Sequence, residues 1–127
     1  MKSYFLSFFA LAILLTTSCN KDDDCVAGNL ETTIVGNWRL TLAGATLGEI
    51  EFKANGDFIH DDNILIPEQI AGAPVETKTY SVQSNSLFTL RASNSLSFSD
   101  FPLTVTSYDC DEIVTNVQGL EYRFKRE

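Results

Sequence analysis

The sequence predicts an all-β protein, a small antiparallel up-and-down barrel of about eight strands, with a β-sandwich as the alternative that the same strand count allows. Three observations support this. From Gly36 onward apolar and polar residues alternate with a period of two, turn signals recur every eight to twelve residues, and no helical periodicity extends beyond one turn. Closure into a barrel also protects the strand edges that eight short strands would otherwise expose.

One helical turn is predicted at the end of the tether, where it leads into the domain. The segment Asn29–Val35 has Asn29 at the N-cap position, where its side-chain oxygen can accept from a backbone N–H. The first strand follows, with Trp38, Leu40 and Leu42 on one face and polar residues between them.

The turn that joins Phe52 to Phe58 has the most specific local pattern. A three-residue loop with Gly56 in the left-handed region pairs Lys53 with Asp57. This register places Phe52 opposite Phe58, so both rings share one face of the hairpin and the opposite charges share the other.

The remaining segments continue the alternation. The predicted strands are Phe58–Ile66, Val75–Gln83, Leu87–Arg91, a run from Leu96 to Val105, Cys110–Val117 and Leu120–Lys125, with a loop at Pro67–Pro74. The large side chains predicted to point inward are Trp38, Phe52, Phe58, Tyr80, Val82, Phe88, Leu90, Phe98, Phe101, Leu103, Val105, Leu120, Tyr122 and Phe124.

The N-terminus predicts a targeting segment. Lys2 precedes an apolar run at Tyr4–Leu15, which is too short to cross the ~30 Å hydrocarbon core of a bilayer and is typical of a signal peptide, assigned to residues 1–18. Leu15-Thr16-Thr17-Ser18-Cys19 resembles a bacterial lipobox, which implies cleavage before Cys19 and acylation of its thiol and amino group. The alternative is an ordinary signal peptide with an incidental cysteine.

An acidic segment follows Cys19. Asn20-Lys21-Asp22-Asp23-Asp24 resembles the surface-export signal of lipoproteins in the Bacteroidota, which implies a lipid-anchored protein of the outer membrane, exposed at the cell surface. The alternative is a solvated acidic tether. Residues 19–33 are assigned to the tether and residues 34–127 to the domain.

Two cysteines remain if Cys19 carries lipid. Cys25 and Cys110 make an even number outside the reducing cytosol, which favours a disulfide, with two free thiols as the alternative. Closing a loop of this length is worth on the order of 4 kcal/mol in the chain-entropy model.

Three motifs together resemble the small lipocalin-like lipoproteins of the Bacteroidota. They are Gly36-Asn37-Trp38, the Phe52–Phe58 hairpin and the closing Tyr122-Arg123-Phe124-Lys125-Arg126. The resemblance implies that Trp38 plugs the closed end of the barrel and that Arg123 or Arg126 packs across it through a cation–π contact. The Thr-Asp-Tyr motif and the C-terminal helix of true lipocalins are missing.

Composition excludes several function classes. With 9 basic and 17 acidic side chains the net charge is −8, which argues against nucleic acid, because phosphate binding requires a basic patch. His60, beside Asp61 and Asp62, is interpreted as part of a solvated face rather than as a metal ligand. We found no catalytic motif or metal-ligand spacing, so we predict a non-enzymatic protein without a cofactor.

Two functions from different classes follow. The first is a membrane-anchored lipoprotein whose barrel binds a small hydrophobic molecule, although the number of aromatic residues favours a filled interior. The second is an interaction or structural module, in which the loop Pro67–Pro74, with Ile70, contacts a protein or glycan partner.

Overall fold

The computed structural model describes residues 28–60 and 64–127. The predicted signal peptide, the lipidated Cys19 and Cys25 lie outside the described residues and stay predictions. The elements are α1 (Leu30–Thr33), β1 (Gly36–Leu42), β2 (Ala45–Phe52), β3 (Phe58–His60), β4 (Gln69–Ile70), β5 (Ala73–Pro74), β6 (Thr77–Ser84), β7 (Leu87–Ser93), β8 (Phe98–Tyr108), β9 (Glu112–Val117) and β10 (Leu120–Arg126).

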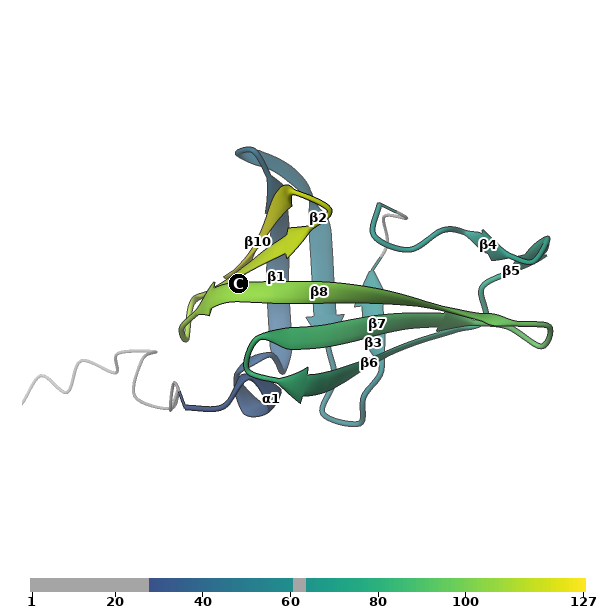
Figure 1. The fold of residues 1–127 in the computed structure, drawn as a ribbon, viewed down its shortest axis with the longest axis horizontal. Coiled ribbons are helices and arrows are strands. Elements are labelled where there is room, and N and C mark those ends of the chain that lie inside the picture. The colour runs from purple at the N-terminus through teal and green to yellow at the C-terminus, as the bar shows by residue number, and fades with distance from the viewer. Residues whose placement is uncertain (1–27, 61–63) are drawn as a thin grey trace, which may run out of the picture.

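Eight strands form one antiparallel sheet in the order β3-β2-β1-β10-β9-β8-β7-β6. Neighbours in the sheet are neighbours in the chain, except that β10 returns to pair with β1. The sheet curls round on itself into a nearly closed barrel (Figure 1). The predicted up-and-down barrel is therefore confirmed, as one continuous sheet rather than the two packed sheets of a sandwich. β4 and β5 pair with each other in a small hairpin outside the main sheet.

The barrel closes across a seam between β3 and β6, where regular pairing stops. One isolated bridge joins Asp57 to Thr79. Three hydrogen bonds cross the same seam: Tyr80 N to Gly56 O (2.8 Å), Tyr80 Oη to Lys53 O (2.6 Å) and Lys78 Nζ to His60 O (3.0 Å). One backbone bond and two side-chain bonds thus complete the closure that the short strand β3 leaves unfinished.

The predicted hairpin register between β2 and β3 is confirmed. Phe52 pairs with Phe58, and Lys53 N donates to Asp57 O at 2.9 Å. Gly56 has a φ of 94°, which an L side chain rarely adopts. The two rings lie on the same face, with their centroids 6.1 Å apart.

Aromatic rings fill the middle of the barrel. Phe52 is at the centre, with ring centroids 4.9 to 6.1 Å away on Phe58, Tyr80, Phe88 and Phe124. These rings come from β2, β3, β6, β7 and β10, so one cluster joins both sides of the seam. Burial of such rings, at about 25 cal/mol per Å² of apolar surface, is the main stabilising force of the barrel.

The two ends of the barrel differ. α1 and the turns 53–57, 85–86 and 109–111 lie at one end, called here the α1 end, and the turns at Ala43–Gly44 and Gln118–Gly119 lie at the far end. The segment with β4 and β5 also belongs to the far end, where Ile66 and Ile70 join the core. Asn94 donates to the carbonyls of Ile70 and Ala73, at 2.8 and 3.1 Å, and ties this segment to β7.

Two predictions about strand length and loop exposure are wrong. Phe58–Ile66 was expected as one strand, but β3 ends at His60, and residues 64–66 lie outside any strand. Ile70, which the interaction hypothesis placed on an exposed loop, is only 7% exposed. The side chain of Ile70 packs onto the core, whereas Pro67, Ala71 and Pro74 in the same loop are exposed.

Two predicted inward side chains are also exposed. Phe98 is 58% exposed, because a period of two puts it on the opposite face of β8 from Phe101, Leu103 and Val105. Leu120 has the same parity as Phe124 but is 51% exposed, because it begins β10 at the far end, beyond the packed interior.

Candidate functional site

α1 covers one end of the barrel. The side chain of Asn29 accepts from Glu31 N at 2.9 Å and caps the turn, as its sequence position predicts. Leu30 and Ile34 are fully buried in the core, and Leu30 N donates to Asn85 Oδ1 at 3.0 Å in the β6–β7 turn. The packed unit therefore includes α1, which the sequence analysis had assigned to the tether.

Trp38 and Arg126 form the centre of the α1 end. The indole of Trp38 is fully buried, and its Nε1 donates to Ile34 O at 2.7 Å. The Cζ atom of Arg126 lies 4.1 Å from the centroid of the indole ring, within the range of a cation–π contact.

The guanidinium of Arg126 also binds three backbone carbonyls. Its Nε, Nη1 and Nη2 donate to Cys110 O (2.6 Å), Val35 O (3.2 Å) and Thr33 O (2.6 Å). Burial lowers the pKa of Arg126 from its usual value, and the Asp111 carboxylate opposes that shift. One side chain of β10 thus ties the end of α1 to the β8–β9 turn, a role that the planar five-donor fork of arginine suits.

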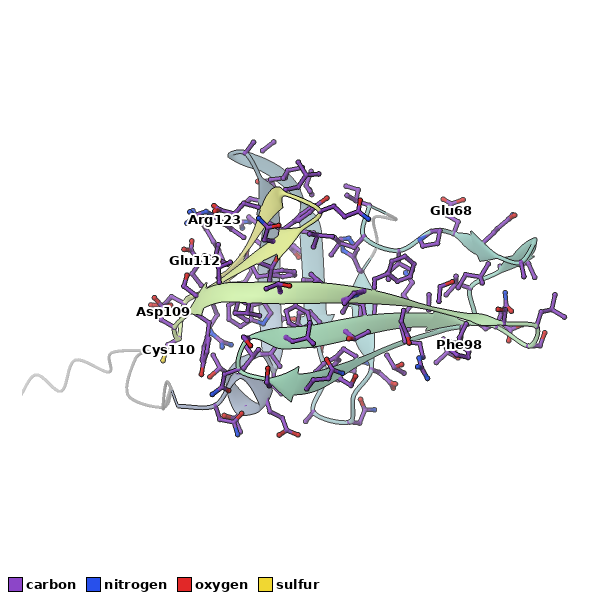
Figure 2. The ribbon with its side chains drawn as sticks, in the orientation of Figure 1. Glu68, Phe98, Asp109, Cys110, Glu112 and Arg123 are labelled. Atoms are coloured by element: carbon purple, nitrogen blue, oxygen red, sulfur yellow. The ribbon has the colours of Figure 1, made fainter. Side chains whose placement is uncertain are left out.

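Cys110 lies in the same β8–β9 turn and is disulfide-bonded. Its predicted partner, Cys25, lies outside the described residues, so that pairing stays a prediction. Figure 2 shows Cys110 at the edge of the molecule near the α1 end.

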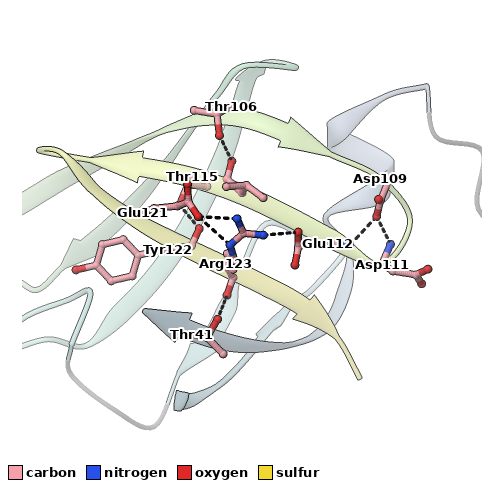
Figure 3. A network of polar contacts seen from close by, with 10 residues as sticks. Thr41, Thr106, Asp109, Asp111, Glu112, Thr115, Glu121, Tyr122 and Arg123 are labelled. Carbon is pink, nitrogen blue, oxygen red and sulfur yellow. Dashed lines mark hydrogen bonds and ion pairs between the residues drawn. The ribbon is translucent and has the colours of Figure 1, made fainter. Parts of the chain in front are cut away.

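Arg123, the other arginine considered for Trp38, does not contact it. It lies on the outer face of β10, where Nη1 is 2.9 Å from Glu112 Oε1 and Nη2 is 2.7 Å from Glu121 Oε1 (Figure 3). Side chains alternate between the two faces of β10, so Arg123 points outward, whereas Phe124 and Arg126 share the inward face. Exposed pairs of this kind contribute little stability, because solvent screens them.

His60 is the residue whose predicted environment was wrong. It was interpreted as solvated, but it is only 3% exposed, because Phe58, Ile59 and His60 alternate inward, outward and inward along β3. Its Nδ1 lies 2.9 Å from Glu49 O, and a carbonyl only accepts, so Nδ1 carries the proton. In the neutral ring Nε2 is then an acceptor, and it is buried without a hydrogen-bond partner.

Comparison with known proteins adds no family. No protein-family model matches the chain, and no curated protein or solved structure matches it either. The likeness to lipocalin-like lipoproteins stays a resemblance.

The described residues contain neither a metal-binding cluster nor a membrane-spanning helix. In residues 28–60 and 64–127, no group of three or more His, Cys, Asp or Glu side chains is placed to hold a metal ion. Over the same residues, no helix has the length and apolar character needed to span a bilayer.

Sequence reasoning missed two features of this site. The alternation Phe58-Ile59-His60 indicates that the ring of His60 points into the barrel. The acidic neighbours of His60 led instead to the interpretation of a solvated side chain. The contact of Asn94 with the β4–β5 hairpin joins residues more than 20 positions apart, and no local pattern signals it.

Proposed function

We propose that the chain is a lipid-anchored protein of the outer membrane whose barrel binds a small, mainly apolar molecule carrying one hydrogen-bond donor. The observation behind this proposal is the unpartnered Nε2 of His60, buried in a mainly apolar interior in which the other buried polar side chains among the described residues, Thr33 and Thr115, have hydrogen-bond partners. An unsatisfied buried polar atom costs about 1–3 kcal/mol, and a ligand hydroxyl or N–H that reaches it recovers that free energy.

The far end of the barrel is the side on which such a ligand would enter. His60 lies at the end of β3 that points away from α1, and Leu47, Leu65, Val75 and Tyr122 pack there as partly buried apolar side chains. At the α1 end, by contrast, Trp38, Arg126 and α1 close the barrel. A ligand in this position would be small, because the rings around Phe52 already fill the middle.

The proposed anchor gives the barrel an orientation. Eight residues separate Cys19 from Gly28, and at ~3.3–3.6 Å per residue they span at most about 30 Å. Because Gly28 precedes α1, a lipid on Cys19 would hold the α1 end toward the membrane. The far end would then face away from the bilayer.

The test compares two probes that differ by one donor. We expect the protein to bind 1-naphthol about tenfold more tightly than naphthalene, because one added hydrogen bond is worth about 1.4 kcal/mol. The readout is the quenching or shift of Trp38 fluorescence, or chemical-shift changes, as each probe is titrated. The protein is the full chain in detergent. His60→Phe should abolish the difference between the probes, and Ile59→Leu, on the outer face of the same strand, should preserve it.

Two results would contradict the proposal. One is that neither probe binds, and the other is that both bind His60→Phe with the wild-type ratio. Native mass spectrometry of the chain from its own host membranes gives an independent readout, in which a bound small molecule is expected in the wild type and is reduced in His60→Phe.

A further inference from the structure

The outer face of β6, β7 and β8 carries a polar hollow of about 270 Å³. In Figure 1 these three strands lie side by side at the front of the barrel. The residues that line the hollow are Thr79, Tyr80, Ser81 and Gln83 on β6, Thr89 and Arg91 on β7, and Asp100 on β8. The ring of Tyr80 packs in the core against Phe52, and His60, on which the interior proposal rests, does not line the hollow.

The strand register builds this hollow. Thr79 pairs with Arg91, and Arg91 pairs with Asp100, so three polar residues form one row across the sheet. Ser81 pairs with Thr89 in the next row. Short side chains thus form the floor of the hollow, and the longer Arg91 and Gln83 form its sides.

The hollow contains an ion pair whose net charge is zero. Arg91 Nε and Nη2 donate to the two oxygens of Asp100, at 2.6 and 2.9 Å. This hydrogen bonding lowers the pKa of Asp100, so its carboxylate stays ionised and paired. Neither a free cation nor a free anion is left to attract an oppositely charged ligand.

The same groups keep unused hydrogen-bonding capacity. Arg91 has five N–H donors and uses two of them on Asp100, whose oxygens each have a further lone pair. Gln83 donates to Ser81 Oγ at 2.6 Å and accepts from Thr89 Oγ1 at 3.1 Å, which fixes its amide in place. Donors and acceptors are therefore interleaved on a rigid sheet, which suits a ligand whose hydroxyls both donate and accept.

An exposed aromatic ring adjoins the hollow. Phe98 begins β8, is 58% exposed, and has the Cζ atom of Arg91 4.4 Å from its ring centroid. Figure 2 shows Phe98 on the outside of the sheet. Arg91 covers one face of this ring, so the opposite face is the one that can attract C–H groups carrying partial positive charge, as on the apolar face of a pyranose.

We infer that this outer face binds a neutral saccharide of at least two rings, with one ring in the hollow between Gln83 and Arg91 and the next stacked on Phe98. The hollow, at about 270 Å³, is smaller than the ~300–1,000 Å³ of pockets that hold drug-sized ligands, so it has room for one ring and the second must lie outside it. An apolar ligand would leave the polar lining unsatisfied. An acidic ligand would meet a protein with a net charge of −8 and no unpaired cation in the hollow.

The test is saturation-transfer-difference NMR with the full chain in a detergent without sugar groups, lauryldimethylamine oxide. The probes are glucose, galactose, mannose and N-acetylglucosamine, together with their homodisaccharides. We expect at least one disaccharide to bind more tightly than its monosaccharide. Its addition should shift the side-chain amide signals of Gln83 and the Nε–H signal of Arg91.

Variants separate the two parts of the site. Phe98→Ala should weaken disaccharide binding about fivefold to tenfold and leave the monosaccharide unchanged, because only the second ring stacks. Gln83→Ala should weaken both. The matched control is Leu120→Ala, which also removes an exposed apolar side chain but lies at the start of β10, outside the hollow.

The inference is overturned if no probe gives saturation transfer, or if binding persists unchanged in both Phe98→Ala and Gln83→Ala. Saccharide-induced shifts at His60 in place of Gln83 and Arg91 would also overturn it. The interior proposal is tested by the naphthol probes, so each of the two proposals can fail without the other.

Discussion

Nη1 of Arg126 lies 2.7 Å from the position that a Cβ on Gly36 would occupy. Gly36 begins β1 with a φ of 133°, and Arg126 ends β10, the strand that pairs with β1. The Gly-x-Trp sequence therefore has a direct physical meaning here. Glycine leaves room for the guanidinium, and Trp38, two residues later, gives the aromatic face on which it lies.

Gly36→Ala is expected to destabilise the protein by about 1–3 kcal/mol, because the new Cβ meets Arg126 and the backbone conformation becomes strained. Urea unfolding of the full chain measures the loss. The control is Gly44→Ala, which also has a positive φ but nothing within 4 Å of the new Cβ. Equal losses in the two variants would show that the contact with Arg126 does not matter.

Arg126→Lys is expected to cost about 2–4 kcal/mol, because lysine keeps the charge but cannot reach Thr33, Val35 and Cys110 with one planar fork. The sequence contains one tryptophan, so Trp38 fluorescence should shift to the red in this variant. Arg123→Lys, in exposed ion pairs on the outer face, should leave the free energy of unfolding and the Trp38 spectrum close to those of the wild type. An unshifted Trp38 spectrum would argue against the role of Arg126 as the cover of the barrel end.

Phe124→Ala is expected to destabilise the protein by about 3–5 kcal/mol, since it leaves a cavity beside Phe52 and Phe88 in the middle of the barrel. Phe98→Ala removes the same side chain from the outer face and should cost about 1 kcal/mol or less. Thermal and urea unfolding check both. Similar losses for the two variants would contradict the inward and outward faces assigned to β10 and β8.

Tyr80 should make the seam sensitive to alkali. Burial first, and Glu31 second, raise the pKa of Tyr80 above its ordinary value of about 10. The folded state then binds the phenolic proton more tightly than the unfolded state. The stability that this proton gives the folded state is fully present below the pKa of Tyr80 in the unfolded chain. It is lost as pH rises through the pKa of Tyr80 in the folded protein.

Tyr80→Phe removes the hydrogen bond to Lys53 O, so it should lower the free energy of unfolding by about 0.5–1.5 kcal/mol at neutral pH. The variant has no phenolic proton, so it should not lose further stability at alkaline pH from this residue. The measurement is the free energy of unfolding from pH 7 to 11. Parallel curves for Tyr80→Phe and the wild type would exclude Tyr80 as the cause. Tyr108→Phe is the control, because Tyr108 lies on β8, away from the seam.

Asp100 should titrate below the ordinary aspartate range of about 3.9, because its hydrogen bond with Arg91 lowers its pKa. A depressed folded pKa gives stability that is present above the unfolded pKa and is lost as pH falls through the folded pKa. Carbon-detected NMR of the Asp100 carboxyl measures this directly. Arg91→Ala should return the midpoint to the ordinary range, and an unchanged midpoint would show that the pair does not hold in solution.

Much of the fold followed from local patterns. The helical turn capped by Asn29, the hairpin that pairs Phe52 with Phe58, and the inward faces of Phe88 and Phe124 each depend on a few adjacent residues. Side-chain parity and turn chemistry act over two to five residues, so a single sequence is enough to determine them. The all-β architecture rests on these local rules, whereas the pairing of β10 with β1 joins strands at opposite ends of the domain.

Other features were decided only by tertiary structure. Whether Arg123 or Arg126 covers Trp38 depends on which face β10 turns inward once it pairs with β1. That Nε2 of His60 has no hydrogen-bond partner depends on the side chains that the closed barrel places around it. The row from Thr79 through Arg91 to Asp100 needs three strands in register. Such contacts join residues far apart in the chain, and only the closed sheet brings them together.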